Sequence, residues 1–597
     1  MRKRSRLKHI DYAGYYVADF ETLAYEGCEH TAVWLWATCD TDCFTCEYGT
    51  NIESFMAWCA ERQSVVGFHN LAFDGYFILD YLLSHGYAAF PMTDVDELRP
   101  GQIKTLISYD GKFYMFEVCF TNGHYCKFVD TLKRIPIPVR LIAPTFNLPE
   151  GKGEIDYTKY REVATNVPTH EEIDYIRRDV EIVARAIAIQ TAEGMEKMTT
   201  ASNAMGEYRE LLGGEGSKFE QQEKAFRLWF PELPAQMDAV MRHAYKGGFT
   251  YVNPAWAGKD CGCGISVDFN SMYPSQMLSR DFPYGMPKYF TGQYEQDDEY
   301  PLYIQGAQVI FTLKPDGIPC ISLHSGFRKV SDTSYIDAVD EPVTIYATNI
   351  DWEIYQEQYD IVILQYIDGF KFKSKQGMFN SYIEKWRAVK ESSKGGKRYI
   401  AKLFLNSLYG RFGLNPRGDC KVPIYDEVEG RVHLTLTPAP ERDTVYLPVA
   451  AFCTSWARRA LFDGINANKD RFVYCDTDSM HLRGLEDPAG IPLDSKRFCC
   501  WKVEGHFRKA VHLHTKCYMW EFAEMGSEDY ELKCTCAGAP ENLRNKLTWD
   551  DFHSGWVNYY TDEQGRFAGW KDGYTKLLPK VIPGGVLLTP AKFSINA

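Results

Sequence analysis

The 597-residue sequence predicts a multidomain protein that combines an α/β part with an α+β part. A single hydrophobic core stops growing at about 300 residues, so a chain of this length should divide into several domains. The first third alternates buried-strand patterns with amphipathic-helix patterns, which is typical of an α/β domain. In the last third, two short apolar stretches flank a polar Asp-Thr-Asp, which predicts an antiparallel hairpin.

The composition is that of a folded protein without a membrane span. Apolar residues make up 45% of the chain and charged residues 24%. No window approaches about 18 consecutive apolar residues, so we expect no membrane helix. No long apolar run follows the basic start Met1–Lys8, so we expect no secretory signal either.

The 18 cysteines are scattered along the chain. Cys43 and Cys46 have C-x-x-C spacing, with Cys39 nearby, but a four-thiolate zinc site needs a second matched pair. We therefore expect reduced thiols in a cytosolic protein, and zinc at this cluster is the alternative.

Charge is unevenly distributed along the chain, although the net charge is −14. Between Lys371 and Lys421, 13 Lys and Arg residues stand against three acidic residues, a local net charge of +10. A solvated surface is the simplest explanation of such a run. Its position between two carboxylate motifs favours an anionic ligand instead.

Asp476 and Asp478 lie at the tip of the predicted hairpin. Residues two apart on a strand point to the same side, so these acids should present paired carboxylates. Close carboxylates repel unless a cation lies between them, and hard oxygens suit Mg²⁺. Asp268 ends another buried strand, which would let it share such an ion. An ordinary polar turn is the alternative.

Acids also mark three elements of the first third. Asp19 and Glu21 lie two apart on a buried strand, and both should project to one side of its end. Asn70 and Asp74 follow a strand end and should share one face of the next helix.

The third of these elements is an amphipathic helix that opens with the capping box Thr169–Glu172. Tyr175 and Asp179 lie on one side of this helix, away from its apolar stripe. Acids on three elements, with a tyrosine beside the last, are what a two-metal nuclease needs to generate hydroxide and stabilise the leaving oxygen. Each acid taken alone is more typical of a surface.

A helix near residue 400 carries a cationic face. Arg398, Lys402, Asn406 and Tyr409 fall within roughly 80° of one another on a helical wheel. Apolar residues form the adjoining face. The cations, the amide and the ring suit a triphosphate and a templated base. Lys390 lies upstream, before Gly395-Gly396.

These motifs resemble those of family B DNA polymerases, in the family's order. Asp19-x-Glu21, Asn70-x-x-x-Asp74 and Tyr175-x-x-x-Asp179 resemble the three exonuclease motifs. Resemblance to the three polymerase motifs is carried by Asp268-x-x-Ser271-x-Tyr273-Pro274, Lys402-x-x-x-Asn406-Ser-x-Tyr409-Gly410 and Tyr474-x-Asp476-Thr-Asp478-Ser479. Tyr245-Lys-Gly-Gly248 resembles the Y-x-G-G element, whose glycines permit close approach to DNA. Lys516-Cys517-Tyr518 resembles the K-x-Y element that touches the primer strand, where the family often has a hydroxyl residue instead of Cys517.

The resemblance implies a ribonuclease H-like exonuclease domain followed by a right-hand polymerase of palm, fingers and thumb. The expected segments are the exonuclease domain (1–195), the first part of the palm (196–279), a first insertion (280–377), the fingers (378–416), a second insertion (417–439), the second part of the palm (440–546) and the thumb (547–597). Insertions at these two places are typical of protein-primed polymerases of phages and linear plasmids, as is the tail Pro583-Gly-Gly-Val-Leu587. In that group the first insertion contacts the terminal protein and DNA, and the second supports strand displacement and processivity.

The implied activity is DNA-directed DNA synthesis on a linear genome by protein-primed initiation, with strand displacement and 3′→5′ proofreading. The implied partners are template and primer DNA, dNTPs and a terminal protein that primes as a heterodimer. The implied cofactor is Mg²⁺, two ions per active site, or Mn²⁺ in its place. A phage-encoded chain would act in the cytoplasm of a bacterial host.

Two alternatives remain. A conventionally DNA-primed family B polymerase would lack the two insertions. An exonuclease whose polymerase-like half only binds DNA would need a broken triad, and Asp268, Asp476 and Asp478 are all present.

The resemblance also assigns roles to individual residues. The implied catalytic residues are Asp268, Asp476 and Asp478 for synthesis, and Asp19, Glu21, Asp74, Asp179, Tyr175 and Lys152 for proofreading. The implied metal ligands are Asp268, the carbonyl of Phe269, Asp476 and Asp478 in one site, and Asp19, Glu21, Glu154 and Asp179 in the other. The implied nucleotide contacts are Tyr273 (a steric gate against a ribose 2′-OH), Lys390, Arg398, Lys402, Asn406 and Tyr409. The implied DNA contacts are Thr22, His69, Asn70, Phe73, Thr131, Leu132 and Tyr157 at a single-stranded primer end, and Tyr245, Gly247, Gly248, Lys516 and Tyr518 elsewhere.

Overall fold

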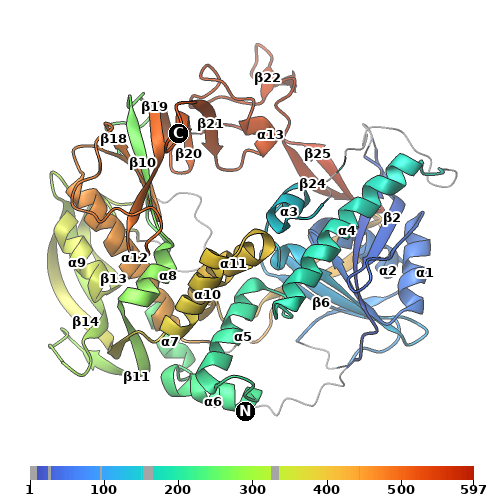
Figure 1. The fold of residues 1–597 in the computed structure, drawn as a ribbon, viewed down its shortest axis with the longest axis horizontal. Coiled ribbons are helices and arrows are strands. Elements are labelled where there is room, and N and C mark those ends of the chain that lie inside the picture. Colours follow the sequence, from blue (N-terminus) through green and yellow to red (C-terminus); the bar gives the residue numbers. More distant parts are fainter. Residues whose placement is uncertain are drawn as a thin grey trace.

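The computed structural model describes residues 10–24, 28–93, 97–149, 151, 153, 166–323, 335–442 and 444–596. Figure 1 shows a mixed sheet with its helices on the right, two further sheets on the left, and a bundle of helices between them. The last part of the chain lies at the top and reaches back to the sheet on the right.

A ten-stranded mixed sheet forms the N-terminal domain. Its order is β16-β15-β6-β7-β8-β4-β1-β2-β3, with β5 paired to β6. The strands are β1 (Tyr15–Thr22), β2 (Val33–Asp40), β3 (Cys46–Gly49), β4 (Ser64–Phe68), β5 (Ala88–Pro91), β6 (Gln102–Ser108), β7 (Phe113–Cys119), β8 (Tyr125–Asp130), β15 (Cys420–Asp426) and β16 (Arg431–Thr437). The hairpin β15–β16 comes from far along the chain and extends this sheet by pairing with β6.

Helices cover this sheet. They are α1 (Ile52–Glu61), α2 (Leu71–Ser84), α3 (Val139–Phe146) and α4 (His170–Ala192), with the short 3₁₀ helix η1 (Thr131–Lys133) after β8. The predicted capping box at the start of α4 forms, because Thr169 and Glu172 each bond the other's backbone N–H. Ile176, Val180 and Val183 of α4 are buried and form the predicted stripe.

A bundle of helices lies between the sheets. It contains α5 (Thr200–Gly213), α6 (Phe219–Trp229), α7 (Ala235–Arg242), α10 (Asn380–Ser392) and α11 (Gly395–Phe412). Phe226, Phe379, Leu405 and Phe412 belong to its shared core. Gly396, at the start of α11, faces the Phe146 ring so closely that a Cβ would lie 2.5 Å from it. This contact joins the bundle to α3.

A seven-stranded antiparallel sheet follows, in the order β21-β20-β19-β10-β18-β17-β9. Its strands are β9 (Thr250–Val252), β10 (Gly264–Phe269), β17 (Phe472–Asp476), β18 (Ser479–Arg483), β19 (Trp501–His514), β20 (Cys517–Glu524) and β21 (Glu531–Cys536). The predicted hairpin around Asp476 and Asp478 is therefore confirmed as β17–β18. Helices α8 (Met272–Ser279) and α12 (Leu447–Ala467) accompany this sheet.

A four-stranded sheet, in the order β11-β14-β12-β13, packs with α9 (Asn349–Gln358) against α12. Its strands are β11 (Asp281–Thr291), β12 (Leu302–Leu313), β13 (Ala338–Thr348) and β14 (Tyr359–Gln376). Val309, Ile345, Leu461 and Met480 share one core, so this sheet and the seven-stranded sheet form one unit around α12.

The C-terminal region contains α13 (Glu541–Arg544) and two hairpins, β22 (Tyr559–Thr561) with β23 (Phe567–Trp570) and β24 (Leu577–Ile582) with β25 (Gly585–Pro590). The tip of the β24–β25 hairpin docks on the N-terminal domain, where Val586 is fully buried in the core that contains Phe77. The N–H of Thr31 donates to the carbonyl of Pro583 at 3.0 Å.

No helix among the described residues is long and apolar enough to span a membrane. The cysteines are free thiols. Cys39 and Cys46 are cross-strand neighbours, whereas Cys43 is exposed on the connecting turn.

Candidate functional site

The strand β10 and the hairpin β17–β18 reach the wall of a cavity of about 1120 Å³. Asp268 of β10 lines it together with Asp478 of the hairpin turn. Burial, followed by the Asp478 carboxylate, raises the pKa of Asp268 to about 6. Burial, followed by the Asp476 carboxylate, raises the pKa of Asp478. Carboxylates that are both buried and close to like charges favour a bound cation.

Asp476 and Asp478 have different partners, in contrast to the side-by-side arrangement that their spacing predicts. Thr477 between them has a φ of 60°, so the pair spans a turn and the strand rule of alternation does not apply. Asp476 accepts hydrogen bonds from Thr250 at 3.0 Å and from Thr477 at 3.1 Å, and pairs with Lys516 at 2.9 Å. Asp478 is the acid of the two that lines the cavity.

The backbone of the hairpin is tied to the strands beside it. The N–H of Phe269 donates to the carbonyl of Asp478 at 2.6 Å, and the N–H of Thr477 donates to the carbonyl of Phe249 at 2.7 Å. The aromatic ring of Phe269 is buried against Trp501. These contacts fix the two acids on a rigid part of the sheet.

Several cations line the same cavity. Lys390 from α10 and Arg398 and Lys402 from α11 all lie there, with Asn406 on the next turn of α11. The Lys390 ammonium donates to Ser271 Oγ at 3.1 Å, and Arg398 donates to the carbonyl of Lys390 at 2.6 Å. Burial, followed by Arg398 and Lys402, lowers the pKa of Lys390. A concentration of like charge of this kind attracts anions.

Two tyrosines of the cavity stack on each other. The rings of Tyr273 and Tyr409 have centroids 4.0 Å apart and planes 24° apart. Both line the cavity. All six residues predicted to contact a nucleotide therefore lie around one cavity together with Asp268 and Asp478.

The segment Tyr245–Gly248 lies against the hairpin turn. A Cβ on Gly248 would lie 2.5 Å from Thr477 Oγ1, so this position must be glycine for the two backbones to meet. Gly247 faces open space, because a Cβ placed there would meet no atom beyond its chain neighbours within 4 Å. Tyr245 packs its hydroxyl end against Gly413, just after α11.

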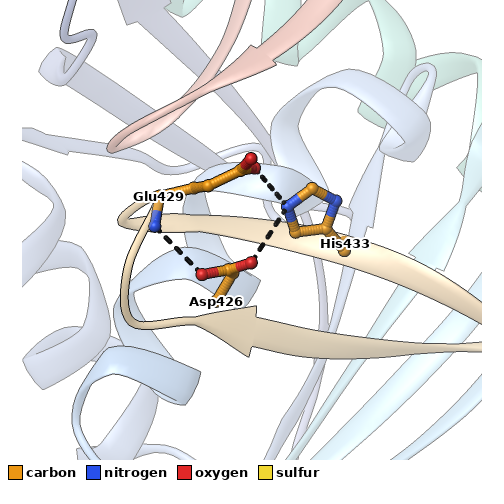
Figure 2. Close-up of side chains that lie close together, drawn as sticks. All are labelled: Asp426, Glu429 and His433. Carbon is orange, nitrogen blue, oxygen red and sulfur yellow. Dashed lines mark hydrogen bonds and ion pairs between the residues drawn. The ribbon is translucent and has the colours of Figure 1, made fainter.

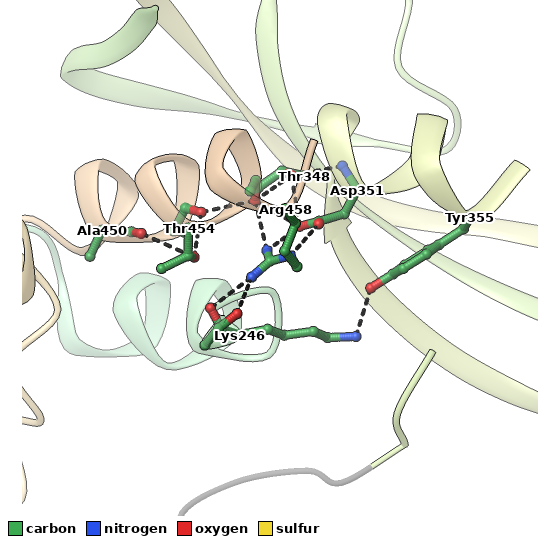
Figure 3. A network of polar contacts seen from close by, with 10 residues as sticks. Lys246, Thr348, Asp351, Tyr355, Ala450, Thr454 and Arg458 are labelled. Carbon is green, nitrogen blue, oxygen red and sulfur yellow. Dashed lines mark hydrogen bonds and ion pairs between the residues drawn. The ribbon is translucent and has the colours of Figure 1, made fainter. Parts of the chain in front are cut away.

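The ion pair between Arg458 and Asp351 fixes the backbone of this segment (Figure 3). Arg458 of α12 donates to the carbonyls of Lys246 and Gly247 at 2.9 and 2.6 Å. Its other nitrogens bind both carboxylate oxygens of Asp351 on α9, at 2.8 and 2.7 Å. Thr348 and Ser455 also donate to this carboxylate. The network is buried, and no motif pointed to it because its members lie on elements far apart in the sequence.

Lys516 and Tyr518 lie at the start of β20, next to the same hairpin. Besides pairing with Asp476, Lys516 donates its backbone N–H to the hydroxyl of Tyr474 at 3.2 Å. The Tyr518 ring lies 5.2 Å from the Tyr474 ring. Cys517 between them is buried, with its Sγ 3.5 Å from Cys536 Sγ across the strands. The thiol of Cys517, where the family often has a hydroxyl residue, thus lies against a second thiol, that of Cys536.

Two charged residues of the cavity escaped the sequence analysis. Lys502 and Glu504 lie on β19, the strand beside Asp268, and both line the cavity. The Lys502 ammonium lies 3.4 Å from Asp268 Oδ1 and 3.0 Å from Glu504 Oε1. They belong to no motif, and only the pairing of β10 with β19 brings them to the site.

A second group of acids lies in the N-terminal domain. Strands β1, β4 and β8 are parallel neighbours, so their carboxyl ends meet at one edge. Asp19 lies near the end of β1, and Asp74 lies in the first turn of α2, which follows β4. Burial, followed by Asp19 and with contributions from Glu21 and Asp130, raises the pKa of Asp74 well above its ordinary value. These acids therefore lie within electrostatic reach of one another.

Asp130, which the sequence analysis missed, connects two segments at this edge. Its Oδ1 accepts hydrogen bonds from the backbone N–H groups of Asn70 at 3.2 Å and Leu132 at 3.0 Å. His69 Nδ1 lies 3.0 Å from Thr131 Oγ1. Asn70 does not share a helix face with Asp74 as predicted. It has a left-handed φ of 90° and is the N-cap residue, which precedes the first helical residue of α2.

The other residues of this second group have the following places. Thr22 ends β1 at an irregularity in its pairing with β2, and Phe73 is half-buried beside Phe77. Tyr175 and Asp179 are buried on α4, which packs against β1 and β2. Lys152, Glu154 and Tyr157 lie outside the described residues.

Asp426, Glu429 and His433, at the tip of the β15–β16 hairpin, bring possible metal-ligand atoms within 4.8 Å of one another (Figure 2). Among the described residues no other group of three His, Cys, Asp or Glu side chains is this compact. Asp426 accepts from the N–H groups of Val428 and Glu429, and Glu429 pairs with Arg431 at 2.6 Å. These contacts show that the acids of the cluster stabilise an exposed turn, which accounts for their proximity.

The chain is similar to known DNA polymerases in sequence and in structure. Residues 58–495 match the family described as DNA polymerase type B, organellar and viral. The DNA polymerase of Bacillus phage B103 is 37% identical over 566 residues, which cover 92% of this chain and 94% of that protein. The DNA polymerase of Bacillus phage phi29 is 35% identical over 605 residues, which cover 97% and 99%. The structure of the phi29 polymerase with primer-template DNA and incoming nucleotides covers 98% of this chain and 100% of that one, with a TM-score of 0.87 and 34% identity.

Proposed function

We propose that this chain, which belongs to the type B DNA polymerases of organelles and viruses, extends a protein primer on a linear genome and proofreads its product. The observation that carries the proposal is the cavity of about 1120 Å³, which is lined by Asp268 and Asp478, by the cations Lys390, Arg398 and Lys402, and by two stacked tyrosines. A DNA-directed DNA polymerase needs acids on one side of a triphosphate and cations on the other.

The donor set at Asp268 and Asp478 fits a divalent metal. Both groups are hard oxygen ligands, and their pKa values are raised first by burial and then by a neighbouring carboxylate. Asp268, the carbonyl of Phe269 and Asp478 would hold Mg²⁺, with Asp476 supporting them from the turn. When bound, two such ions supply activation of the 3′-hydroxyl and stabilisation of the leaving oxygen.

The remaining cavity residues bind and orient the nucleotide. Lys390, Lys402 and Arg398 offset the charge of the triphosphate, and Asn406 lies on the same face of α11. Tyr273 and Tyr409 shape the base and sugar pocket, with Tyr273 acting as the gate against a 2′-OH. Lys516 and Tyr518 contact the primer strand, and Tyr245, Gly247 and Gly248 contact the DNA near the hairpin.

Proofreading uses the acids of the N-terminal domain. Asp19, Glu21, Glu154 and Asp179 would hold the metals there, and Asp74 is a further catalytic acid. Tyr175 and Lys152 orient water and the scissile phosphate. The proximity of Asp74 to Asp19 and Glu21 supports this assignment. The primer end is held by Thr22, His69, Asn70, Phe73, Thr131, Leu132 and Tyr157.

The segments 280–377 and 417–439 support protein priming and strand displacement. They form the β11–β14 unit and the β15–β16 hairpin. The similar phi29 protein was solved with primer-template DNA and nucleotides, which supports DNA and dNTPs as partners here. We place the exonuclease at 1–195, the palm at 196–279 and 440–546, the fingers at 378–416 and the thumb at 547–597. A terminal protein is the primer, and the site of action is the bacterial cytoplasm.

Two sets of substitutions separate the activities. Asp478→Asn is expected to abolish primer extension and to leave 3′→5′ degradation intact. Asp19→Ala with Asp74→Ala is expected to do the reverse. Extension and degradation are measured on the same labelled primer-template. Loss of both activities from one folded variant would contradict the assignment of two sites.

Protein priming is tested with labelled dATP, template and a candidate terminal protein. Covalent transfer of the nucleotide to that protein is the expected result. Extension of DNA primers without any transfer to a cognate terminal protein would favour a conventionally primed enzyme.

A further inference from the structure

A lysine ammonium lies next to the proposed metal ligands. Lys502 is the register partner of Asp268, across the β10–β19 pair. Its Nζ lies 3.4 Å from Asp268 Oδ1 and 3.0 Å from Glu504 Oε1. The register between β10 and β19 shifts beside Glu504, where Ser266 pairs with Gly505 and Val267 with Val503. Such an irregularity redirects side chains, and here it accompanies the approach of Glu504 to the ammonium.

The polymerase acids are not gathered into a compact ligand group in this structure. Among the described residues, Asp268, Asp476 and Asp478 do not bring three ligand atoms within 4.8 Å of one another. Each of two acids instead has a lysine: Asp268 has Lys502, and Asp476 has Lys516 at 2.9 Å. Lysine is a compact point charge on a flexible stem, so it compensates a carboxylate without fixing its geometry.

Lys502 and a divalent ion need the same oxygen atoms. An ammonium and a metal ion repel each other, and both are attracted to Asp268. The lysine stem has rotatable bonds throughout, and Glu504 offers a second carboxylate at closer range than Asp268. The ammonium therefore has a place to go when a cation binds Asp268.

We propose that Lys502 is a resident counter-cation of the polymerase metal site, which balances Asp268 until a metal binds and weakens metal binding until a nucleotide arrives. The inference rests on the proposed assignment of Asp268 and Asp478 as metal ligands. An incoming triphosphate adds negative charge to the cavity, which offsets the repulsion between the ion and the ammonium. Metal occupancy is thereby linked to nucleotide binding, and Lys502 is a positioning residue of the site.

The test measures metal binding directly. Full-length protein with Asp19→Ala and Asp74→Ala is the parent, and the same protein with Asp478→Asn measures the Mn²⁺ that binds outside the polymerase site. Free Mn²⁺ is followed by electron paramagnetic resonance during titration, first without and then with primer-template and the next dNTP. The primer ends in a dideoxynucleotide, so no turnover occurs.

Lys502→Met keeps the stem and removes the charge. It is expected to bind Mn²⁺ about tenfold more tightly than the parent when no nucleotide is present. With primer-template and dNTP the difference is expected to shrink to about twofold or less. Lys502→Arg keeps the charge and is expected to behave like the parent. Unchanged or weaker Mn²⁺ binding by Lys502→Met would overturn the proposal.

Lys496→Met is the matched control, because Lys496 lines the same cavity from the loop before β19. Its Mn²⁺ affinity is expected to equal that of the parent, and a gain as large as that of Lys502→Met would also overturn the proposal. Asp478→Asn separates the two hypotheses. If it leaves Mn²⁺ binding intact, the metal ligands are wrongly assigned. If it abolishes binding while Lys502→Met changes nothing, only the role of Lys502 is wrong.

Discussion

Arg458 on α12 and Asp351 on α9 form a buried ion pair. Removing one partner of such a pair leaves an uncompensated charge, which costs about 3–5 kcal/mol. Arg458→Met is therefore expected to lower the free energy of unfolding by that amount, measured by urea denaturation. Asp351→Asn in the same chain is expected to restore a large part of the loss, because no buried carboxylate then remains.

The neighbouring residue provides a control for this prediction. Arg459 pairs with Glu357 and Asp463, whose side chains are 44% and 53% exposed. Arg459→Met should cost about 1 kcal/mol or less, as exposed pairs do. Equal effects of the two substitutions would show that burial does not set the strength of the Arg458 pair.

His481 and His512 give the protein a pH-dependent stability. Their ring nitrogens lie 2.8 Å apart, and both rings are buried. Burial lowers the pKa of His512 to about 3, and burial followed by His512 lowers the pKa of His481 well below its ordinary value. The folded values lie below the unfolded value of about 6.5, so the unfolded chain gains more protons as the pH falls. Stability is full above about pH 6.5 and is lost as the pH falls from there.

The loss between about pH 7.5 and pH 5.5 should be about 1.4 kcal/mol for each histidine. His512→Gln keeps a polar neighbour for His481 and is expected to remove its share of this pH dependence from the urea midpoint. His514→Gln, on the same strand, is the control and should leave the dependence unchanged. A parent with equal stability at the two pH values would contradict the prediction.

The β17–β18 hairpin depends on one glycine. A Cβ at Gly248 would lie 2.5 Å from Thr477 Oγ1, which itself donates to Asp476. Thr477 is β-branched and stiff, so Gly248→Ala should push the turn and misplace the acids. We expect the rate of nucleotide addition to fall about 100-fold, with 3′→5′ degradation unchanged.

A second substitution checks that the steric contact is the cause. Thr477→Ala removes the two closest atoms that the new methyl group would meet. Single-turnover extension by the double variant should therefore recover relative to Gly248→Ala, when both are compared with Thr477→Ala alone. Additive losses in the double variant would rule out the contact as the explanation.

Local elements could be predicted from the sequence, and long-range pairing could not. Hydrophobic periodicity and capping chemistry sufficed for α4, for the β17–β18 hairpin and for the cationic face of α11. Lys502 and Asp130 escaped because their roles come from neighbours on other strands, Asp268 in one case and the Asn70 and Leu132 backbone in the other. The alternation rule failed at Asp476 and Asp478 because it assumes a strand where the chain makes a turn.

The C-terminal hairpin β24–β25 connects the end of the described chain to the N-terminal domain. Its tip residues Gly584 and Gly585 have positive φ values and lie against Thr31 and Phe77 so closely that no Cβ fits there. The C-terminal hairpin also touches the β15–β16 hairpin, where Arg431 donates to the carbonyl of Val581 at 3.1 Å. A sequence motif marked this tail, but nothing in it indicated that its partner is the N-terminal domain.

Weakening this contact should shorten the products of synthesis. Val586→Ala leaves a cavity in the core beside Phe77, which costs about 2 kcal/mol of docking. We expect shorter products from a single binding event, measured with a competitor DNA trap, with little change in the rate of single additions. Leu588→Ala, an exposed position on the same strand, should leave product length unchanged. Equal product lengths for both variants would contradict the proposal that docking of the tip lengthens the products of synthesis.

The docked tip also bears on how the chain is made. Thr31 and Pro583 are bonded although they lie near opposite ends of the chain. During synthesis on the ribosome, the N-terminal domain emerges long before Val586 exists, and its core beside Phe77 stays incomplete until the last segment follows. The core beside Phe77 is therefore completed by a contact of very long range in the sequence, which forms only after the C-terminal hairpin has been synthesised.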